Sequence, residues 1–373
     1  MQKVGIVTYY SIYNYGSVMQ AYALSETIKK MGYEAVLIDH ANLNKKWNKK
    51  IRFRVLRDRL IQLLTHPLYI YNTVRIKNAG KNDIVIRSLD QDKKFDEFLD
   101  RWFKYPETDY TKDNSYVAFI CGSDQVWQLS LPGLHYVFFL RFCDKKKRIS
   151  YAASFGATSI PDYNKKLLKK YLNDFSYISV RERIGVDIVE KNSENKALQV
   201  LDPVLLVGRE FWDRFTEKYV IDIPYLVAYF LSNPDGYIDE IRDYANKYDL
   251  KIVWISTGYE KTINGEDIIE PAPREFIDVV RNAQFVCTDS LHGTEFAIIF
   301  HKQFITFPRK YKIVPEQHSR ILSLLELTGM NNRLYEGNNC NWSKTIDYQI
   351  MEMNLEKMRK KSLEFLKTAL TFT

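Results

Sequence analysis

The sequence VGIVT, residues 4–8, is a short apolar run that predicts a buried strand of a parallel sheet. A polar loop over residues 11–17 follows it, and then apolar residues recur over 18–31 at the spacing of one helix face. Residues 35–39, after Gly32, predict a second strand. Strand, helix and strand in this order form a βαβ unit. Such a unit predicts a doubly wound parallel sheet that binds ligands at the carboxyl ends of its strands.

The rest of the chain continues the alternation of strands and helices. Asp202-Pro203 closes a first series of strands, and a second series starts after Pro224. We therefore expect an α/β fold with two Rossmann-like lobes that face a cleft, over residues 1–220 and 221–345, and a C-terminal helix over 346–373 that crosses back to the first lobe. The remaining strands are expected at residues 117–121, 149–153, 177–180, 225–231, 251–256, 285–288 and 304–307.

Length and composition agree with two lobes. The 373 residues exceed the roughly 250 to 300 at which a single core stops growing. Hydrophobic residues make up 46% of the chain, which is enough for a full core and excludes a disordered chain. The net charge of +8 favours anionic partners, such as phosphates, anionic glycans, membrane surfaces or nucleic acid, without choosing among them.

The cysteines and the N-terminus indicate a cellular compartment. Cys121, Cys143, Cys287 and Cys340 lie far apart and show neither a CxxC pair nor metal-ligand spacing. The N-terminal residues pass directly into a strand, without the apolar core of a signal peptide. No apolar run approaches the roughly 18 residues that span a bilayer. These features predict a cytoplasmic protein.

An irregular insert, residues 41–115, separates the second and third expected strands. Its segment 41–60 carries eight Lys and Arg residues against the single acid Asp58, with apolar residues between them. A basic amphipathic segment can lie on the inner membrane surface or hold a lipid pyrophosphate, and the cytoplasmic face would then be the location of the protein. A solvated helix packed on the core by its apolar side gives the same pattern, so both interpretations stay open.

The segment TDSLHGT, residues 288–294, lies between a short buried strand and an apolar helix. Amide groups at the start of a helix lack partners within the helix, and the helix dipole favours an anion there, so a phosphate or carboxylate can bind. His292 would lie beside that anion with a pKa that can cross neutrality, as proton transfer requires. The simpler alternative is a helix cap made by Asp289 or Ser290.

Two loops of the first lobe follow strands and suit a sugar. Residues 14–17, NYGS, open the first long helix, where a glycine permits a tight turn and amides can hold an oxygen. They match neither the GxGxxG nor the GxxxxGK[ST] spacing, so we find no support for a dinucleotide site or a P-loop. Residues 121–127, CGSDQVW, offer Asp124 and Gln125 to sugar hydroxyls and Trp127 as a flat apolar face. A helix cap and a turn with Trp127 in the core are the structural alternatives.

Basic residues follow the strand at 177–180 and recur near the end of the second lobe. Arg181 and Arg183 come directly after the strand, and a later group comprises Arg309, Lys310, Lys312 and Arg320. An arginine at a strand end can hold a carboxylate or phosphate through two parallel hydrogen bonds. For Arg183 and Arg309 a surface salt bridge is the simpler interpretation.

Taken in order, these segments resemble the polysaccharide pyruvyl transferase family nearly from end to end. Each motif is short, but the set and its order are specific, and the insert at 41–115 matches least. The resemblance is carried by residues 14–17 with 20–24, 121–127, 151–156 (YAASFG), 179–182 (SVRE), Asp202-Pro203 and 288–294.

The resemblance implies a GT-B-like fold and transfer of pyruvate from phosphoenolpyruvate to two hydroxyls of a sugar, in a polysaccharide or its lipid-linked precursor. A cyclic ketal and inorganic phosphate would result, with neither a cofactor nor a metal. The resemblance assigns acid–base catalysis to His292. It assigns donor binding to Arg181, Ser290, Leu291, Gly293, Lys312 and Arg320, and acceptor binding to Asn14, Tyr15, Gly16, Ser123, Asp124, Gln125 and Trp127. Leu291 and His318 depart from the residues that are common in the family, which concerns specificity rather than the reaction.

Two other functions compete with this expectation. A glycosyltransferase that uses a nucleotide sugar would need the same two-lobed cleft, since a fold does not fix a function. A non-catalytic glycan-binding or assembly subunit would keep the cleft without turnover. Nucleic acid is disfavoured as a partner because the basic residues gather in the insert without a recognised binding module. The sequence leaves the oligomeric state open.

Overall fold

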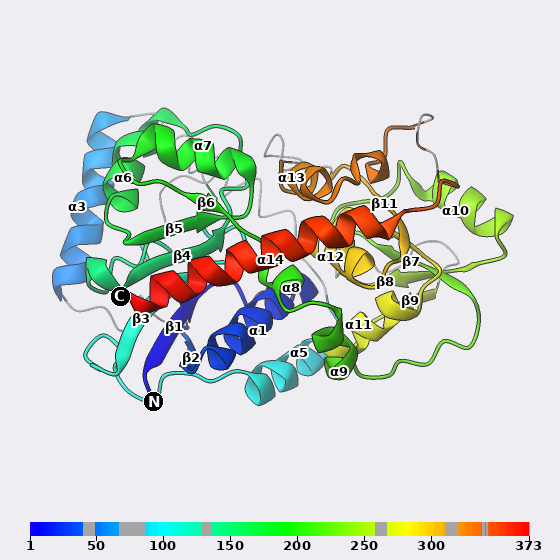
Figure 1. The fold of residues 1–373 in the computed structure, drawn as a ribbon, viewed down its shortest axis with the longest axis horizontal. Coiled ribbons are helices and arrows are strands. Elements are labelled where there is room, and N and C mark those ends of the chain that lie inside the picture. The colour runs from blue at the N-terminus through cyan, green and yellow to red at the C-terminus, as the bar shows by residue number, and fades with distance from the viewer. Residues whose placement is uncertain are drawn as a thin grey trace.

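The computed structural model describes residues 1–39, 49–66, 87–128, 136–257, 267–309, 319–337, 340 and 342–372. The helices and strands form two lobes side by side, and one long C-terminal helix runs across both (Figure 1). Each lobe contains its own parallel sheet. The expected α/β fold with two Rossmann-like, GT-B-like lobes is confirmed.

The N-terminal lobe contains a parallel sheet of six strands in the order β2-β1-β3-β4-β5-β6. Successive residues of its strands alternate between two hydrophobic clusters, as in β3, where Ala118 and Ile120 join one cluster and Phe119 and Cys121 the other. Burial on both faces explains why the strands are continuous apolar runs. The strands are β1 Lys3–Val7, β2 Glu34–Leu37, β3 Tyr116–Cys121, β4 Arg148–Ala153, β5 Tyr177–Val180 and β6 Leu198–Gln199.

The helices of this lobe include two from the insert. One of them, α3, lies against α6 at the outer edge of the lobe, and the other, α5, packs Phe95 and Phe98 into the core (Figure 1). The described helical segments are α1 Tyr15–Lys30, α3 Lys49–Thr65, α5 Leu89–Trp102, the 3₁₀ turn η2 Lys145–Lys147, α6 Asp162–Leu172 and α7 Arg183–Asn192.

The C-terminal lobe contains a parallel sheet of five strands in the order β11-β10-β7-β8-β9. Its strands are β7 Tyr225–Tyr229, β8 Lys251–Ile255, β9 Asp267–Ile269, β10 Phe285–Thr288 and β11 Gln303–Thr306. Its helical segments are α10 Ile238–Lys247, α11 Pro273–Asn282, α12 Leu291–Ile299, α13 Ser319–Thr328 and the 3₁₀ turn η3 Asn331–Arg333.

Both sheets have a point where the strand order reverses direction, and ligands of such folds bind outside the carboxyl ends of the strands at that point. In the first sheet it lies between β1 and β3, and in the second between β7 and β10. The loops that follow these four strands include residues 8–14, 122–127 and 289–290. They are the segments in which the sequence predicted a site.

The two lobes share one hydrophobic core. Tyr15, at the start of α1, stacks on Phe276 of α11 with ring centroids 4.4 Å apart, and its hydroxyl donates to the carbonyl of Pro271 at 2.7 Å. One cluster of buried residues runs from Val4 of β1 to Phe296 of α12. The packing therefore fixes the start of α1 against the C-terminal lobe.

The C-terminal helix α14, Tyr348–Thr371, joins the lobes a second time. Its first residue, Tyr348, donates to the carbonyl of Lys302 in the C-terminal lobe. Further along, the hydroxyl of Ser362 accepts from the amide of Leu201 at 3.0 Å, in the N-terminal lobe. The helix therefore crosses back to the first lobe, as expected (Figure 1).

The link between the sheets contains two short helices, α8 Pro203–Leu206 and α9 Arg209–Phe215, and the domain boundary predicted at residue 220 lies after them. The strands β6 and β9 were not expected, because two or three residues carry no readable periodicity. Among the helices that the structure describes, none is both long enough and apolar enough to span a bilayer.

Candidate active site at the lobe interface

Buried polar side chains gather at the carboxyl edge of the N-terminal sheet. Thr8 follows β1, Ser123 and Asp124 follow β3, Ser154 follows β4, and Arg181 follows β5. The strands are parallel, so residues far apart in the sequence meet at one edge. The chain uses this edge for polar groups although the sheet on which it rests is apolar.

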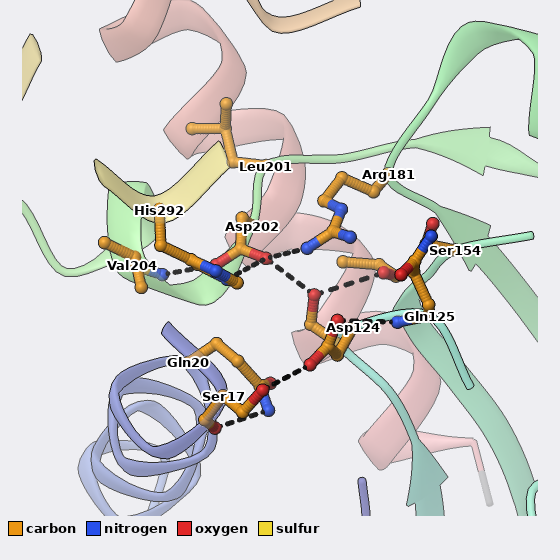
Figure 2. A network of polar contacts seen from close by, with 12 residues as sticks. Ser17, Gln20, Asp124, Gln125, Ser154, Arg181, Leu201, Asp202, Val204 and His292 are labelled. Atoms are coloured by element: carbon orange, nitrogen blue, oxygen red, sulfur yellow. Dashed lines mark hydrogen bonds and ion pairs between the residues drawn. The ribbon is translucent and has the colours of Figure 1, made fainter. Parts of the chain in front are cut away.

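Asp202 lies at the centre of this polar layer (Figure 2). It is the N-cap of α8, and its Oδ1 accepts from the amide of Val204 at 3.0 Å. Its Oδ2 accepts from Ser123 Oγ at 2.7 Å and from Arg181 Nη1 at 2.8 Å, and His292 Nε2 lies 3.7 Å away. The side chain of Asp202 is 0% exposed, so these groups replace water around its carboxylate.

The charges of Asp202 and Arg181 depend on each other. Burial by itself would raise the pKa of Asp202, but His292, Arg181 and the Val204 amide hold it well below its ordinary value. Burial also disfavours the positive charge of Arg181, and Asp202 outweighs that effect and raises the pKa of Arg181. Removal of one partner from a buried ion pair typically costs about 3–5 kcal/mol, so neither residue is a simple surface charge.

The C-terminal lobe contributes the start of α12 to this site. Ser290 is the N-cap, and its Oγ accepts from the amide of Gly293 at 3.3 Å. His292 is the second residue of the helix, and its imidazole faces Asp202 of the other lobe (Figure 2). A Cβ atom at Gly16 would lie 2.0 Å from His292 Nδ1, so only glycine lets the start of α1 approach this ring. His292 is therefore held between two elements of the N-terminal lobe.

Asp289 and Gly293 shape the same turn. The carboxylate of Asp289 accepts from the amides of Leu231 and Ser232, at 2.6 and 2.9 Å, and so ties the loop after β7 to the start of α12. A Cβ atom at Gly293 would lie 2.6 Å from Thr288 Oγ1. The helix-cap interpretation holds for Ser290, and Asp289 has a different structural role.

Glu295 also faces the cluster, although it did not figure among the expected site residues. It lies three positions after His292 on α12 and is 1% exposed. Burial, and next the negative charge of Asp202, raise the pKa of Glu295 well above its ordinary value. Four buried atoms here have no hydrogen-bond partner within the described part of the chain: Glu295 Oε2, His292 Nε2, and Nε and Nη2 of Arg181. Unpaired buried atoms are rare in folded proteins and are typical of a place where a ligand binds.

The donor atoms of Asp202, His292 and Glu295 lie within 4.8 Å of one another, which is ligand spacing for a metal ion. However, Asp202 Oδ2 already accepts from Ser123 and from the guanidinium of Arg181. A divalent cation on this oxygen would lie beside a fixed positive charge and be repelled by it. We assign no metal to this cluster, and the expectation of a metal-free reaction stays a prediction.

The loops after β1 and β3 are hydrogen-bonded to each other. Asp124 accepts from Ser17 Oγ at 2.7 Å and from the amide of Gln125 at 2.8 Å. The Gln20 side chain donates to Thr8 Oγ1 at 2.9 Å and to the carbonyl of Ser17 at 2.8 Å (Figure 2). The polar groups of Ser123 and Asp124 thus have protein partners and hold the layer around Asp202 in place.

A cavity of about 280 Å³ lies between the lobes. It is next to the His292 cluster, because Asn14 and Tyr15 line it and the following residue, Gly16, touches His292. Its other lining residues include Arg87 and Gln91 from the N-terminal lobe, and Tyr229, Ser256 and Arg309 from the C-terminal lobe.

The cavity walls carry positive charge from both lobes. Arg87 Nε donates to Asp92 at 2.8 Å, and its guanidinium lies 5.1 Å from the ring centre of Tyr13. Arg309 acts electrostatically on Asp289 and on Tyr229. An anionic or strongly polar ligand fits these walls better than an apolar one.

The structure corrects the expected role of Trp127. The indole is 1% exposed and stacks on Phe139, with ring centroids 5.3 Å apart. Its Nε1 donates to the carbonyl of Phe138 at 2.9 Å. Both faces of the ring are inside the core, so Trp127 offers no platform for a sugar, and the core interpretation of this loop is right.

Other expected site residues are distributed as follows. Arg181, Ser290, Leu291, His292, Gly293 and Gly16 meet in the cluster, and Arg320 lies close enough to Glu295 to lower its pKa. Lys312 and His318 lie outside the described residues. Gln125 packs its side chain against Gly156, where a Cβ atom would lie 2.2 Å from Gln125 Nε2.

Sequence reasoning missed four residues of the site. Asp202 was interpreted only as a lobe boundary, although an Asp before a Pro is the sequence of a capped helix start. Glu295 had a readable signal, because a lone carboxylate three residues after His292 interrupts an apolar helix. Arg87 and Gln91 had none, because their place in the cavity depends on how the insert folds back.

Two doubly wound lobes with titratable groups at the meeting point of their strand ends are the architecture of a two-lobed α/β enzyme. The chain belongs to the polysaccharide pyruvyl transferase family, whose sequence profile matches residues 14–311. It is therefore a transferase that acts on a sugar acceptor. No curated protein matches the chain in sequence.

Several solved structures have a similar chain path. The UDP-GlcNAc 2-epimerase from Methanocaldococcus jannaschii in complex with UDP-GlcNAc and UDP is 15% identical, with a TM-score of 0.45 over 100% of this chain and 99% of that chain. The UDP-GlcNAc 2-epimerase from Neisseria meningitidis bound to UDP-GlcNAc is 10% identical, with a TM-score of 0.44 over 99% and 94%. A spinosyn rhamnosyltransferase is 8% identical, with a TM-score of 0.37 over 100% and 94%. Likeness at this level says nothing about activity.

We expect Trp127→Ala to lower the free energy of unfolding by about 3–5 kcal/mol, because it removes a fully buried aromatic ring. Urea unfolding measures this value. The control is Tyr248→Ala, which removes an aromatic ring that is 43% exposed and should cost less than about 1 kcal/mol. Equal small losses in both variants would contradict the core role of Trp127.

Proposed function

We propose that the protein transfers pyruvate from phosphoenolpyruvate to two hydroxyls of a sugar and releases phosphate, leaving a cyclic ketal. The main support is the buried cluster at the lobe interface. It contains a fixed cation, Arg181, with two unpaired N–H groups, and a histidine beside it. Phosphoenolpyruvate carries a carboxylate and a phosphate, and both are acceptors that a guanidinium binds through parallel hydrogen bonds.

The donor would bind between Arg181 and the start of α12. The amides near Ser290 and Leu291 and the helix dipole favour an anion at that position. Arg320 adds positive charge nearby, and Lys312 is proposed to join it. The acceptor sugar would occupy the neighbouring cavity, with Asn14 and the two arginines of its walls around the hydroxyls or an anionic group of the glycan.

His292 would carry protons for the sugar hydroxyls and the leaving phosphate. Asp202 fixes the imidazole from 3.7 Å and stabilises its protonated form. The positive charge of Arg181 would favour the departing phosphate as its negative charge develops. Each role needs the residue at its present place in the cluster, and none of them requires a metal or a cofactor.

Phosphoenolpyruvate should protect the protein against thermal unfolding, because a ligand that binds only the folded state stabilises it by about 2.7 kcal/mol at a hundredfold excess over Kd. Protection should be strongly reduced in Arg181→Lys, which keeps the charge and loses the planar fork. Arg183→Gln is the matched control, since Arg183 lies two residues away and is exposed.

The competing function is a glycosyltransferase that uses a nucleotide sugar, for which the two arginines of the cavity would suit a diphosphate. The same melting experiment with a panel of nucleotide sugars separates the two. A shift with nucleotide sugars and none with phosphoenolpyruvate would reject pyruvyl transfer.

His292→Ala should lower the rate of phosphate release from phosphoenolpyruvate by about 10²-fold or more, because general acid–base catalysis typically contributes 10²–10⁴-fold. Phosphate release in the presence of a panel of methyl glycosides measures this rate. Circular dichroism should show an unchanged fold. Turnover at the wild-type rate would exclude His292 from the chemistry.

We also propose that α3 contacts an anionic membrane surface from the cytoplasmic side. Its Phe53, Leu56, Leu60 and Leu64 are 53% to 75% exposed, at the spacing of one helix face. Its polar side faces the protein instead, where buried Asp58 accepts from Tyr171 Oη at 3.0 Å and Lys170 Nζ at 3.2 Å. This orientation is the reverse of a solvated helix that packs by its apolar side. A cytoplasmic location is supported by four free cysteines.

Vesicles with anionic lipids should bind the wild-type protein and bind a Phe53→Ser/Leu56→Ser/Leu60→Ser variant at least about tenfold more weakly, since burial of these side chains contributes to interfacial binding. Sedimentation with the vesicles measures the difference. Ile350→Ser/Met353→Ser is the control, because these exposed apolar residues lie on α14. Equal binding of all three proteins would contradict the role of α3.

A further inference from the structure

Pyruvyl transfer moves two protons. Two sugar hydroxyls lose one each as their oxygens bond to C2 of phosphoenolpyruvate. One of these protons must end on the methylene carbon C3, which becomes a methyl group. The other must end on the phosphate that leaves when the bond between C2 and its oxygen breaks. Two proton-carrying groups are therefore needed near C2 and C3, and His292 is only one of them.

The buried carboxylates near His292 differ in whether they are free to carry a proton. Asp202 accepts from Arg181, Ser123 and the Val204 amide, which keep it ionised. Asp289 accepts from two amides of the loop after β7. In contrast, Glu295 Oε2 has no hydrogen-bond partner within the described residues.

Glu295 lies where a second proton carrier is needed. It shares one face of α12 with His292, and its carboxylate, the imidazole and Asp202 lie within 4.8 Å of one another. The two unpaired N–H groups of Arg181 belong to the same cluster. An anion bound to Arg181 would therefore be next to both His292 and Glu295.

The charged groups around Glu295 come from several elements. Asp202 of α8 and Asp124 after β3 disfavour a negative charge on Glu295, while Arg181 after β5 and Arg320 of α13 favour it. His292 lies on its own helix. Burial is the largest influence, and the outcome is a pKa of Glu295 well above its ordinary value.

We propose that Glu295 is the second proton carrier of pyruvyl transfer and donates to C3 of phosphoenolpyruvate. This inference rests on the proposed function. The O–H bond of Glu295 breaks as the C3–H bond forms, and C2 becomes an oxocarbenium-like centre. The first hydroxyl adds to C2 and gives its proton to His292, which passes it to the phosphate as the C2–O bond to phosphate breaks. The second hydroxyl then adds to C2 and returns a proton to Glu295.

The first test measures thermal unfolding between about pH 5 and pH 8 and requires no substrate. An acid whose pKa is raised in the folded state stays protonated there, while the unfolded state ionises above the ordinary value of 4.5. Glu295 thus lowers wild-type stability progressively as the pH rises above that value. Glu295→Gln, which is nearly isosteric with the neutral acid, should melt about 2 °C or more above the wild type at pH 8 and show little difference at pH 5. Glu364→Gln, an exposed change on α14, should show no such trend.

The second test measures phosphate release from phosphoenolpyruvate with a panel of methyl glycosides. Glu295→Gln should be at least about 10²-fold slower than the wild type, while phosphoenolpyruvate still protects it from unfolding. Glu295→Asp keeps a carboxyl group and should retain part of the rate. A melting difference that does not change with pH, or a Glu295→Gln enzyme with wild-type turnover, would overturn the assignment.

The two levels of failure are distinguishable. A wild-type protein that phosphoenolpyruvate does not protect overturns the proposed function, and with it the role of Glu295 in it. Protection of the wild type together with normal turnover of Glu295→Gln overturns only the role of Glu295.

Discussion

The buried carboxylate of Asp202 is the constraint on which the rest of the site depends. An ion with no exposed surface must find its solvation within the protein, and Asp202 finds it in a serine after β3, an arginine after β5 and a histidine from the other lobe. These groups come from both lobes, so the carboxylate is fully satisfied only when the lobes meet. The same contact places an acid–base group beside a fixed cation, as group transfer to a sugar requires.

Apolar packing maintains that meeting of the lobes. Tyr15 stacks on Phe276 across the interface, and α14 is bonded to both lobes through Tyr348 and Ser362. The cavity between the lobes lies directly beside the His292 cluster, because the loop that ends with Asn14 and Tyr15 separates the two. The core therefore positions a polar cluster and an open space next to each other, although neither is part of the apolar packing itself.

Much of the fold could be predicted from the sequence because its signals are local. The apolar runs at β1, β3, β4, β5, β7, β8, β10 and β11 are buried on both faces, and the structure places strands within a few residues of the predicted ranges. The helix start at Ser290 and its histidine were also readable. Trp127 was ambiguous, because an aromatic residue after a strand end has the same sequence pattern whether its ring faces a ligand or the core.

The sequence by itself determined the two α/β lobes, the strand-end loops that carry polar residues, and the family. Only the tertiary structure decided which polar residues serve each other and which remain without a partner. Ser123 and Asp124 became structural partners, whereas Arg181, His292 and Glu295 kept unpaired atoms. The physical reason is that periodicity reports the burial of one face of an element. The partner of a buried polar atom, and hence its charge, is set by residues of another lobe more than a hundred positions away in the chain.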